Sequence, residues 1–150
     1  MLELTLASKP NALNTANAVV VPPGMLSAAS DVSKVMLAGG TQMTAVLAFA
    51  SKIGFNEENT AIGTTSYITS DESANFKNLV QEISDIPAIS VNPGLKNSQY
   101  SGLRAFSEGF AKEGVGAGGS IISSMLKTGN DSAKFLELAE KEYHRLFTLL

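Results

Sequence analysis

Residues 35–42 read Val35-Met36-Leu37-Ala38-Gly39-Gly40-Thr41-Gln42, and this stretch decides the fold. Its first four residues are all apolar, which is typical of a short strand buried in a parallel sheet. Two glycines then allow a tight turn, and Thr41 is a residue type that caps helices. Apolar residues follow at helical spacing until Gly54, namely Met43, Val46, Leu47, Ala50 and Ile53. The stretch therefore predicts a strand, a glycine turn and an amphipathic helix that ends at Gly54.

The same alternation continues downstream. Further strands are predicted at Thr60–Ile62, with an extension toward Ile68, and at Ala88–Val91. Between them, Asp71 or Ser73 is expected to cap a helix with an apolar stripe of Phe76, Leu79, Val80 and Ile83. Strands that alternate with helices predict βαβ crossovers and a parallel sheet. The predicted fold is a Rossmann-like, three-layer α/β domain over residues 1–150, with a short sheet and a helical C-terminal part.

The two ends of the chain are less regular. We expect residues 1–23 to form an irregular or weakly structured lead-in, in which Val19–Val21 is a candidate fourth strand. After Gly94 the pattern is helical to the end. The last helix carries a wide apolar stripe made of Phe135, Leu138, Ala139, Tyr143, Leu146, Phe147 and Leu150. That stripe is explained by packing on the core or by a dimer contact.

Composition excludes several classes of protein. The 150 residues are 44% hydrophobic and carry a formal net charge of -3, so the chain can form a core but has no excess of basic residues for nucleic acid. It has no cysteine and one histidine, which excludes thiolate metal sites and cysteine nucleophiles and disfavours a histidine-dependent triad. We find no signal-peptide pattern and no apolar segment near the ~20 residues that a bilayer requires, and we expect a cytoplasmic protein.

Two glycine clusters are candidate anion sites. The first is Gly39-Gly40-Thr41, between the apolar strand and its helix. The second follows Glu113 and contains Gly114, Gly116, Gly118 and Gly119. Glycines let a backbone approach a ligand closely, and N–H groups at a helix start attract phosphate. A flexible connector with tight turns has the same composition, and spacing alone leaves both interpretations open.

Neither cluster matches a common nucleotide motif. Gly119 is followed by Ser120-Ile121, whereas a Walker A motif requires Lys-Ser or Lys-Thr. A dinucleotide-dependent oxidoreductase would need an acidic residue ~20 positions after the glycines, and Asp71 lies further from Gly40 than that.

Among the acidic residues, Glu113 is the first candidate for a general base because it adjoins the second glycine cluster. The alternative is an ordinary exposed glutamate. Glu108 is a weaker candidate of the same kind, and His144 fits a surface or an interface better than catalysis. Three further side chains are candidates to line a pocket: Tyr67, Tyr100 and Arg104.

Two longer stretches, Val35–Ala48 and Glu108–Gly119, carry a resemblance to a known family. The sequence resembles the nicotinate-nucleotide–dimethylbenzimidazole phosphoribosyltransferase family over residues 24–127, and most closely a branch of it without an assigned function. The second stretch is similar to that family's Gly-Glu-Gly-x-Gly-Ala motif, whose glutamate is the catalytic base. By this resemblance Glu113 is the base, and Gly114 and Gly116 belong to the loop around the ribose phosphate.

The resemblance implies an enzyme that moves phosphoribose from nicotinate mononucleotide to 5,6-dimethylbenzimidazole. The product is α-ribazole 5′-phosphate, used for the lower ligand of cobalamin. No metal and no organic cofactor are implied, and the partners are these small molecules and a second copy of the chain in a homodimer.

The sequence also departs from the family. Family members are much longer, and this chain resembles their C-terminal half. Lys112 stands where many members have glycine, and Pro22-Pro23 stands where a helix is expected. Gly63-Thr64-Thr65 is only superficially similar to the family's N-terminal phosphate motif, whose role is not transferred to it. The alternative function is therefore a truncated, non-catalytic module for nucleotide binding or assembly.

Overall fold

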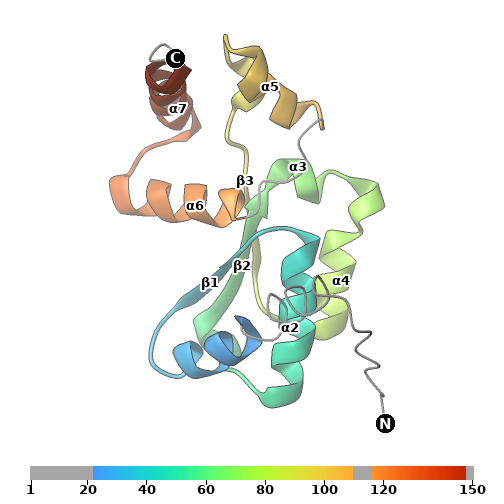
Figure 1. Ribbon diagram of the computed structural model, residues 1–150. Helices are drawn as coiled ribbons and strands as arrows, with labels where there is room; N and C mark the ends of the chain where they lie inside the picture. Colours follow the sequence, from blue (N-terminus) through green and yellow to red (C-terminus); the bar gives the residue numbers. More distant parts are fainter. Residues whose placement is uncertain (1–21, 110–115, 148–150) are drawn as a thin grey trace, which may run out of the picture.

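The computed structural model describes residues 22–109 and 116–147. At its centre is a sheet of three parallel strands in the order β1-β2-β3 (Figure 1). The strands are β1 (Val35–Ala38), β2 (Thr60–Thr65) and β3 (Ala88–Val91). Ala38 is in register with Gly63, and Thr65 with Val91. The carboxyl ends of the strands therefore lie at the same end of the sheet.

One face of the sheet packs against α2 (Thr41–Ile53), α4 (Phe76–Ile83) and the helical residues 22–30. The buried cluster between these layers contains Leu26, Leu37, Val46, Leu47, Ala50, Ile62, Phe76, Val80 and Ile86. Each large apolar side chain removed from water in this way contributes about 1.5–3 kcal/mol of transfer free energy.

The other face is covered by α6 (Ala117–Thr128), which contacts all three strands. Side chains alternate along a strand, so Met36 and Ala38 face α6 while Leu37 faces α2. Ser123 Oγ lies 3.9 Å from the Met36 sulfur. The predicted three-layer, Rossmann-like α/β fold with a short parallel sheet is thus confirmed.

Short helical segments connect these elements. They are η1 (Glu57–Asn59), α3 (Ser66–Thr69), η2 (Glu72–Ala74) and η3 (Leu95–Asn97). Beyond β3 the described chain is helical, as predicted, in α5 (Ser101–Ser107), α6 and α7 (Ser132–Phe147). α7 is held against the segment before α5, because Glu140 Oε1 accepts hydrogen bonds from Ser98 Oγ and from the backbone N–H of Gln99, both at 2.7 Å.

Local details differ from the prediction between β2 and α4. β2 ends at Thr65, and Ile68 lies in α3 rather than in a strand. Asp71 accepts a hydrogen bond from the backbone N–H of Ser73, but it caps η2. α4 begins only at Phe76, after Asn75 in the left-handed region with φ 46°. An asparagine tolerates that conformation, which interrupts the predicted helix.

Two apolar stripes were also predicted incorrectly in part. Ile53, at the end of α2, is 60% exposed instead of buried. No residue of α7 is buried, so packing on the core is the wrong explanation for its stripe. Leu138, Leu146 and Phe147 are 43%, 51% and 59% exposed. Leu150 lies outside the described residues.

At the start of the described chain, helix extends back to Pro22, two residues into the lead-in expected to be irregular. Val19–Val21 lie outside the described residues. At the far edge of the sheet, Ala88, Ile89 and Ser90 of β3 are exposed, with Pro87 before the strand and Pro93 after it.

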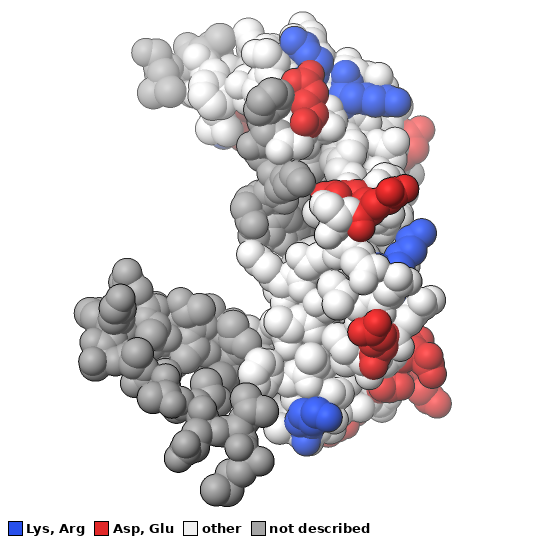
Figure 2. Space-filling model, turned by 90° about the vertical axis from the view of Figure 1, so that its right-hand side faces the viewer, with Lys and Arg blue, Asp and Glu red and all other residues white. Residues whose placement is uncertain are grey.

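On the face shown in Figure 2, basic and acidic side chains are interspersed and form no continuous basic stripe. Within residues 22–109 and 116–147, no helix combines the length and apolarity that crossing a membrane requires.

Candidate functional site

The first glycine cluster forms the turn from β1 into α2. The backbone N–H of Gly39 donates to the Gly63 carbonyl oxygen at 2.9 Å, which extends the pairing of the two strands by one residue. Gly40 is the N-cap of α2. Thr41, expected as the cap, is instead the first residue of the helix, and its side chain makes no capping hydrogen bond. α2 therefore begins at the carboxyl end of β1 without a side chain that caps its first N–H groups.

The second cluster starts α6 at the same place. Gly116 is the N-cap of α6, in the left-handed region with φ 78°. A Cβ atom built on Gly116 would lie 3.7 Å from the carbonyl oxygen of Ala38, the residue that precedes Gly39. The structure thus brings the start of α6 beside the start of α2, although 75 residues of sequence separate Thr41 from Gly116.

Both helix starts have the features of an anion site. Neither α2 nor α6 has a side-chain cap or an acidic residue in its first turn. The first N–H groups of a helix have no partner within the helix, and the positive end of the helix dipole lies there. Two such starts at one end of a parallel sheet suit a phosphate group.

Gly118 and Gly119 have a packing role that the sequence did not predict. A Cβ on Gly118 would lie 2.1 Å from the carbonyl carbon of Thr64, and a Cβ on Gly119 would lie 2.5 Å from Cβ of Ala38. Gly63 of β2 is similarly close to α6, because a Cβ built on Gly63 would lie 2.9 Å from Cα of Gly119. Only glycine allows α6 to come this close to the strands.

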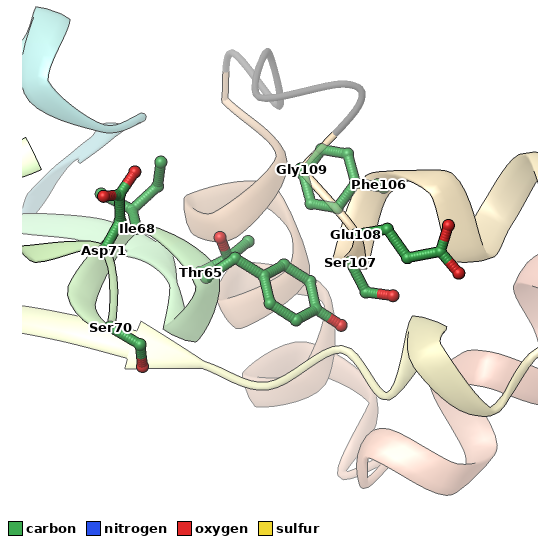
Figure 3. A pocket seen from close by; sticks show the side chains of 9 residues that line it. Thr65, Ile68, Ser70, Asp71, Phe106, Ser107, Glu108 and Gly109 are labelled. Carbon is green, nitrogen blue, oxygen red and sulfur yellow. The ribbon is translucent and has the colours of Figure 1, made fainter. Parts of the chain in front are cut away.

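A cavity of about 290 Å³ opens next to these helix starts, between α3 and the end of α5 (Figure 3). The residues that line it are Thr65, Tyr67, Ile68, Ser70, Asp71, Phe106, Ser107, Glu108 and Gly109. It is connected to the first glycine cluster through Ile68, whose Cδ1 would lie 3.4 Å from a Cβ on Gly40. A concave, partly apolar site at the carboxyl ends of parallel strands is the usual place for a ligand in an α/β fold.

Tyr67 forms a wall of this cavity. Its ring meets that of Phe106 edge-to-face, with 5.6 Å between the ring centroids. Its hydroxyl oxygen is buried and makes no hydrogen bond of ordinary geometry within the described chain. Burial raises the pKa of the Tyr67 hydroxyl, and the nearby backbone N–H groups of Leu95 and Lys96 offset part of that rise. The phenol therefore stays protonated and its ring provides a fixed aromatic surface.

The other residues singled out from the sequence are placed as follows. Glu108 lines the cavity. Tyr100 and Arg104 do not line it: Tyr100 stacks near Tyr143 of α7, and Arg104 Nη1 donates to the Ser98 carbonyl at 2.7 Å. His144 lies 3.1 Å from the Tyr100 hydroxyl. Glu113 and Gly114 lie outside the described residues.

Several cavity residues were not predicted. Thr65 ends β2, Ser70 and Asp71 link α3 to η2, and Phe106 lies in α5, so no single motif in the sequence connects them. Of the lining residues, the sequence had singled out Tyr67 as a candidate to line a pocket and Glu108 as a weaker candidate for a general base. Among the described residues, no cluster of histidine, aspartate or glutamate could hold a metal ion.

Fold and site together define an α/β protein whose glycine-rich helix starts meet at the carboxyl ends of a parallel sheet. Its homologues are named UPF0284 proteins. The chain is 45% identical to one from Aeropyrum pernix over 116 residues, which make up 75% of this chain and 31% of that protein. It is 38% identical to one from Acaryochloris marina over 136 residues, or 85% and 37% of the two chains.

A third relative, from Archaeoglobus fulgidus, is 45% identical over 112 residues, or 75% of this chain and 31% of that protein. The chain thus spans about a third of the length of these relatives. No family model matches it. The name of the relatives states no substrate and no reaction.

Proposed function

We propose that this chain carries the phosphoribosyl-binding part of a pentosyltransferase that moves phosphoribose from nicotinate mononucleotide to a benzimidazole nitrogen. One observation supports this most strongly: the uncapped starts of α2 and α6 meet at the carboxyl ends of the strands, next to a cavity. In this proposal Gly39, Gly40, Thr41 and Gly116 surround the 5′-phosphate. Gly118 and Gly119 hold the helix start in place.

The reaction makes one bond at the ribose C1′ and breaks another. The acceptor's basic nitrogen attacks C1′, and the nicotinate nitrogen leaves with the electron pair of the old bond. The acceptor's second nitrogen loses its proton, which Glu113 accepts in this proposal. Removing that proton prevents positive charge from accumulating on the product ring, and such proton transfer contributes typically ~10²–10⁴-fold to rate.

The test is turnover of nicotinate mononucleotide with 5,6-dimethylbenzimidazole, followed by the appearance of α-ribazole 5′-phosphate and nicotinate. We expect Glu113→Gln to lower kcat by about 10²–10⁴-fold while nicotinate mononucleotide still binds. Glu82→Gln on the exposed face of α4 is the matched control, and should leave kcat unchanged. Equal rates for the parent chain and Glu113→Gln would remove the role of this carboxylate.

A non-catalytic module is the second candidate, because the two uncapped helix starts can bind a phosphate group without any catalysis. Such a module would bind nicotinate mononucleotide without turnover. Binding without products in the parent chain would therefore support the module and exclude the complete enzyme. We further propose that the chain forms a homodimer through the exposed apolar face of α7.

A further inference from the structure

α5 is a short helix that provides one wall of the cavity. It has seven residues, and its last turn supplies Phe106 and Ser107 to the lining. The Phe106 ring meets the ring of Tyr67 in α3 with 5.6 Å between the centroids. In the described chain no residue of α5 is buried, and an isolated helix shorter than about 12 residues is marginal in water. The order of this wall therefore depends on what holds α5 at its other end.

At its start, α5 is held by a side chain of α7. In the described chain the side chain of Tyr100, the N-cap residue of α5, makes no capping hydrogen bond. Glu140 of α7 lies here instead. Its Oε1 accepts hydrogen bonds from Ser98 Oγ and from the backbone N–H of Gln99, both at 2.7 Å, and its Oε2 accepts one from the Gln99 side-chain amide at 3.2 Å. A carboxylate at this position also interacts favourably with the helix dipole.

Ser98 connects Glu140 to the first turn of α5. It is 4% exposed. Its hydroxyl oxygen accepts a hydrogen bond from the backbone N–H of Tyr100 at 3.1 Å, and its carbonyl oxygen accepts one from Arg104 Nη1 at 2.7 Å. Without Glu140, the Ser98 hydroxyl and the Gln99 N–H would lose their acceptor, which is costly for a buried group. The segment would then rearrange, and α5 would lose the contacts that fix its start.

Aromatic contacts bring α7 to the same turn. The Tyr143 ring lies 4.9 Å from the Tyr100 ring, and a Cβ built on Gly102 would clash with the Tyr143 hydroxyl. The Tyr100 hydroxyl lies 3.1 Å from Nδ1 of His144. Figure 1 shows α5 and α7 at the same end of the molecule. The polar and aromatic contacts of α7 thus converge on residues 98–102.

We infer that α7 acts as a strap for the cavity: its docking on residues 98–102 orders α5 and fixes the Phe106 wall, and its release loosens that wall. α7 suits this role because the buried cluster of the described chain contains none of its residues, so it can undock without opening the core. The coupling does not depend on any reaction. Its effect on turnover rests on the proposed function.

Amide hydrogen exchange of the full chain tests the inference. Glu140→Ala removes both acceptor oxygens, and we expect the protection of residues 101–107 to fall about tenfold or more, together with that of α7, since a hydrogen bond to a charged group has about that effect. Amides of β1 and β2 should keep their protection. Glu140→Gln keeps an acceptor oxygen and should restore most of the protection in α5.

Glu142→Ala is the matched control. Glu142 is also a glutamate of α7, but its carboxylate pairs with Arg145 of the same helix. This variant should leave α5 as it is in the parent chain. Loss of protection in the α7 of Glu140→Ala with α5 unchanged would overturn the inference. So would an α5 that is unprotected in the parent chain, or a loss that β1 and β2 share equally.

A fluorescent probe reports on the cavity wall itself. The chain has no tryptophan, so Phe106→Trp places a single indole in the wall. Acrylamide should quench this indole about twofold or more strongly when Glu140→Ala is added, because local opening exposes the wall to solvent. Adding Glu142→Ala should leave the quenching unchanged. Equal quenching in both double variants would contradict the strap, and the exchange measurement decides alone if Phe106→Trp does not fold.

The outcomes separate this inference from the proposed function. A wall loosened in Glu140→Ala, with no release of nicotinate by any of the chains, would support the strap and exclude the complete transferase. Release of nicotinate by the parent chain, with α5 equally protected in Glu140→Ala, would support the transferase and overturn the strap.

Discussion

At the scale of single residues, the contact between α6 and the sheet depends on glycines, which have no side chain. Gly118 lies on the backbone of Thr64, and Gly119 lies on Ala38 and Gly63. A flexible side chain moves aside when a neighbour grows, but main-chain atoms in a strand do not. These positions are therefore much less tolerant of substitution than an ordinary helical glycine.

We predict that Gly118→Ala destabilises the fold by about 1–3 kcal/mol or more, since its Cβ would lie 2.1 Å from a backbone carbon. Gly24→Ala is the matched control, because Gly24 is also helical and nothing lies within 4 Å of its Cβ position. That change should stabilise by about 0.5–1 kcal/mol. Urea denaturation measures both, and equal midpoints for the two variants would contradict the prediction.

Residue patterns predicted the strands better than the boundaries between β2 and α4. The apolar run Val35–Ala38, followed by two glycines, is typical of a strand covered on both faces, and β1 is such a strand. The break at Asn75 was not predictable, because asparagine adopts ordinary helical angles as well as left-handed ones. The cavity was not predictable either, since Asp71 and Phe106 become neighbours only through packing of α3 on α5.

At the scale of elements, α7 is attached by polar and aromatic contacts instead of by burial. Glu140 accepts hydrogen bonds from Ser98 and Gln99, and Tyr143 stacks between Tyr100 and Phe147. Helical periodicity predicted the apolar stripe on α7 but not that the stripe stays unburied. A helix without a buried residue contributes little to the global stability, and we expect it to unfold locally before the sheet does.

We predict that the docking of α7 weakens in acid. The hydrogen bonds from Ser98 and Gln99 lower the pKa of Glu140 below its ordinary value of 4.5. A lowered pKa in the folded state means that the stabilisation is complete above pH 4.5 and is lost as the pH falls through the folded-state pKa. Amide hydrogen exchange in α7, followed from neutral to acid pH, should show this loss of protection.

Glu140→Gln removes the titrating group while keeping an acceptor, so its α7 should show no such pH-dependent step. Glu82→Gln, on α4, should behave as the parent chain does. A step of unchanged size in Glu140→Gln would assign the acid sensitivity to another group.

At the scale of the whole molecule, the sheet is small and its β3 edge is exposed, while relatives of this chain are about three times as long. Parallel sheets are normally covered on both faces and paired along their strands. The exposed residues of α7 add apolar surface that monomeric proteins seldom leave in contact with water.

We predict that the chain sediments as a dimer through α7. Leu138→Glu combined with Leu146→Glu places two charges on the exposed face of α7 and should shift the equilibrium to monomer. Leu126→Glu, on a residue of α6 that is 77% exposed, should leave the dimer intact. Sedimentation velocity measures all three chains, and a parent chain that sediments as a monomer would exclude the dimer.

The two prolines that bracket β3 also limit what can attach to that edge. Proline has no N–H to donate, so Pro87 and Pro93 interrupt the row of main-chain donors on either side of the strand. An incoming segment from another molecule meets only the few outward amides of Ala88–Val91 before the ladder stops. Open-ended stacking of such sheets into fibres is thereby discouraged, even though the strand itself carries no charged side chain.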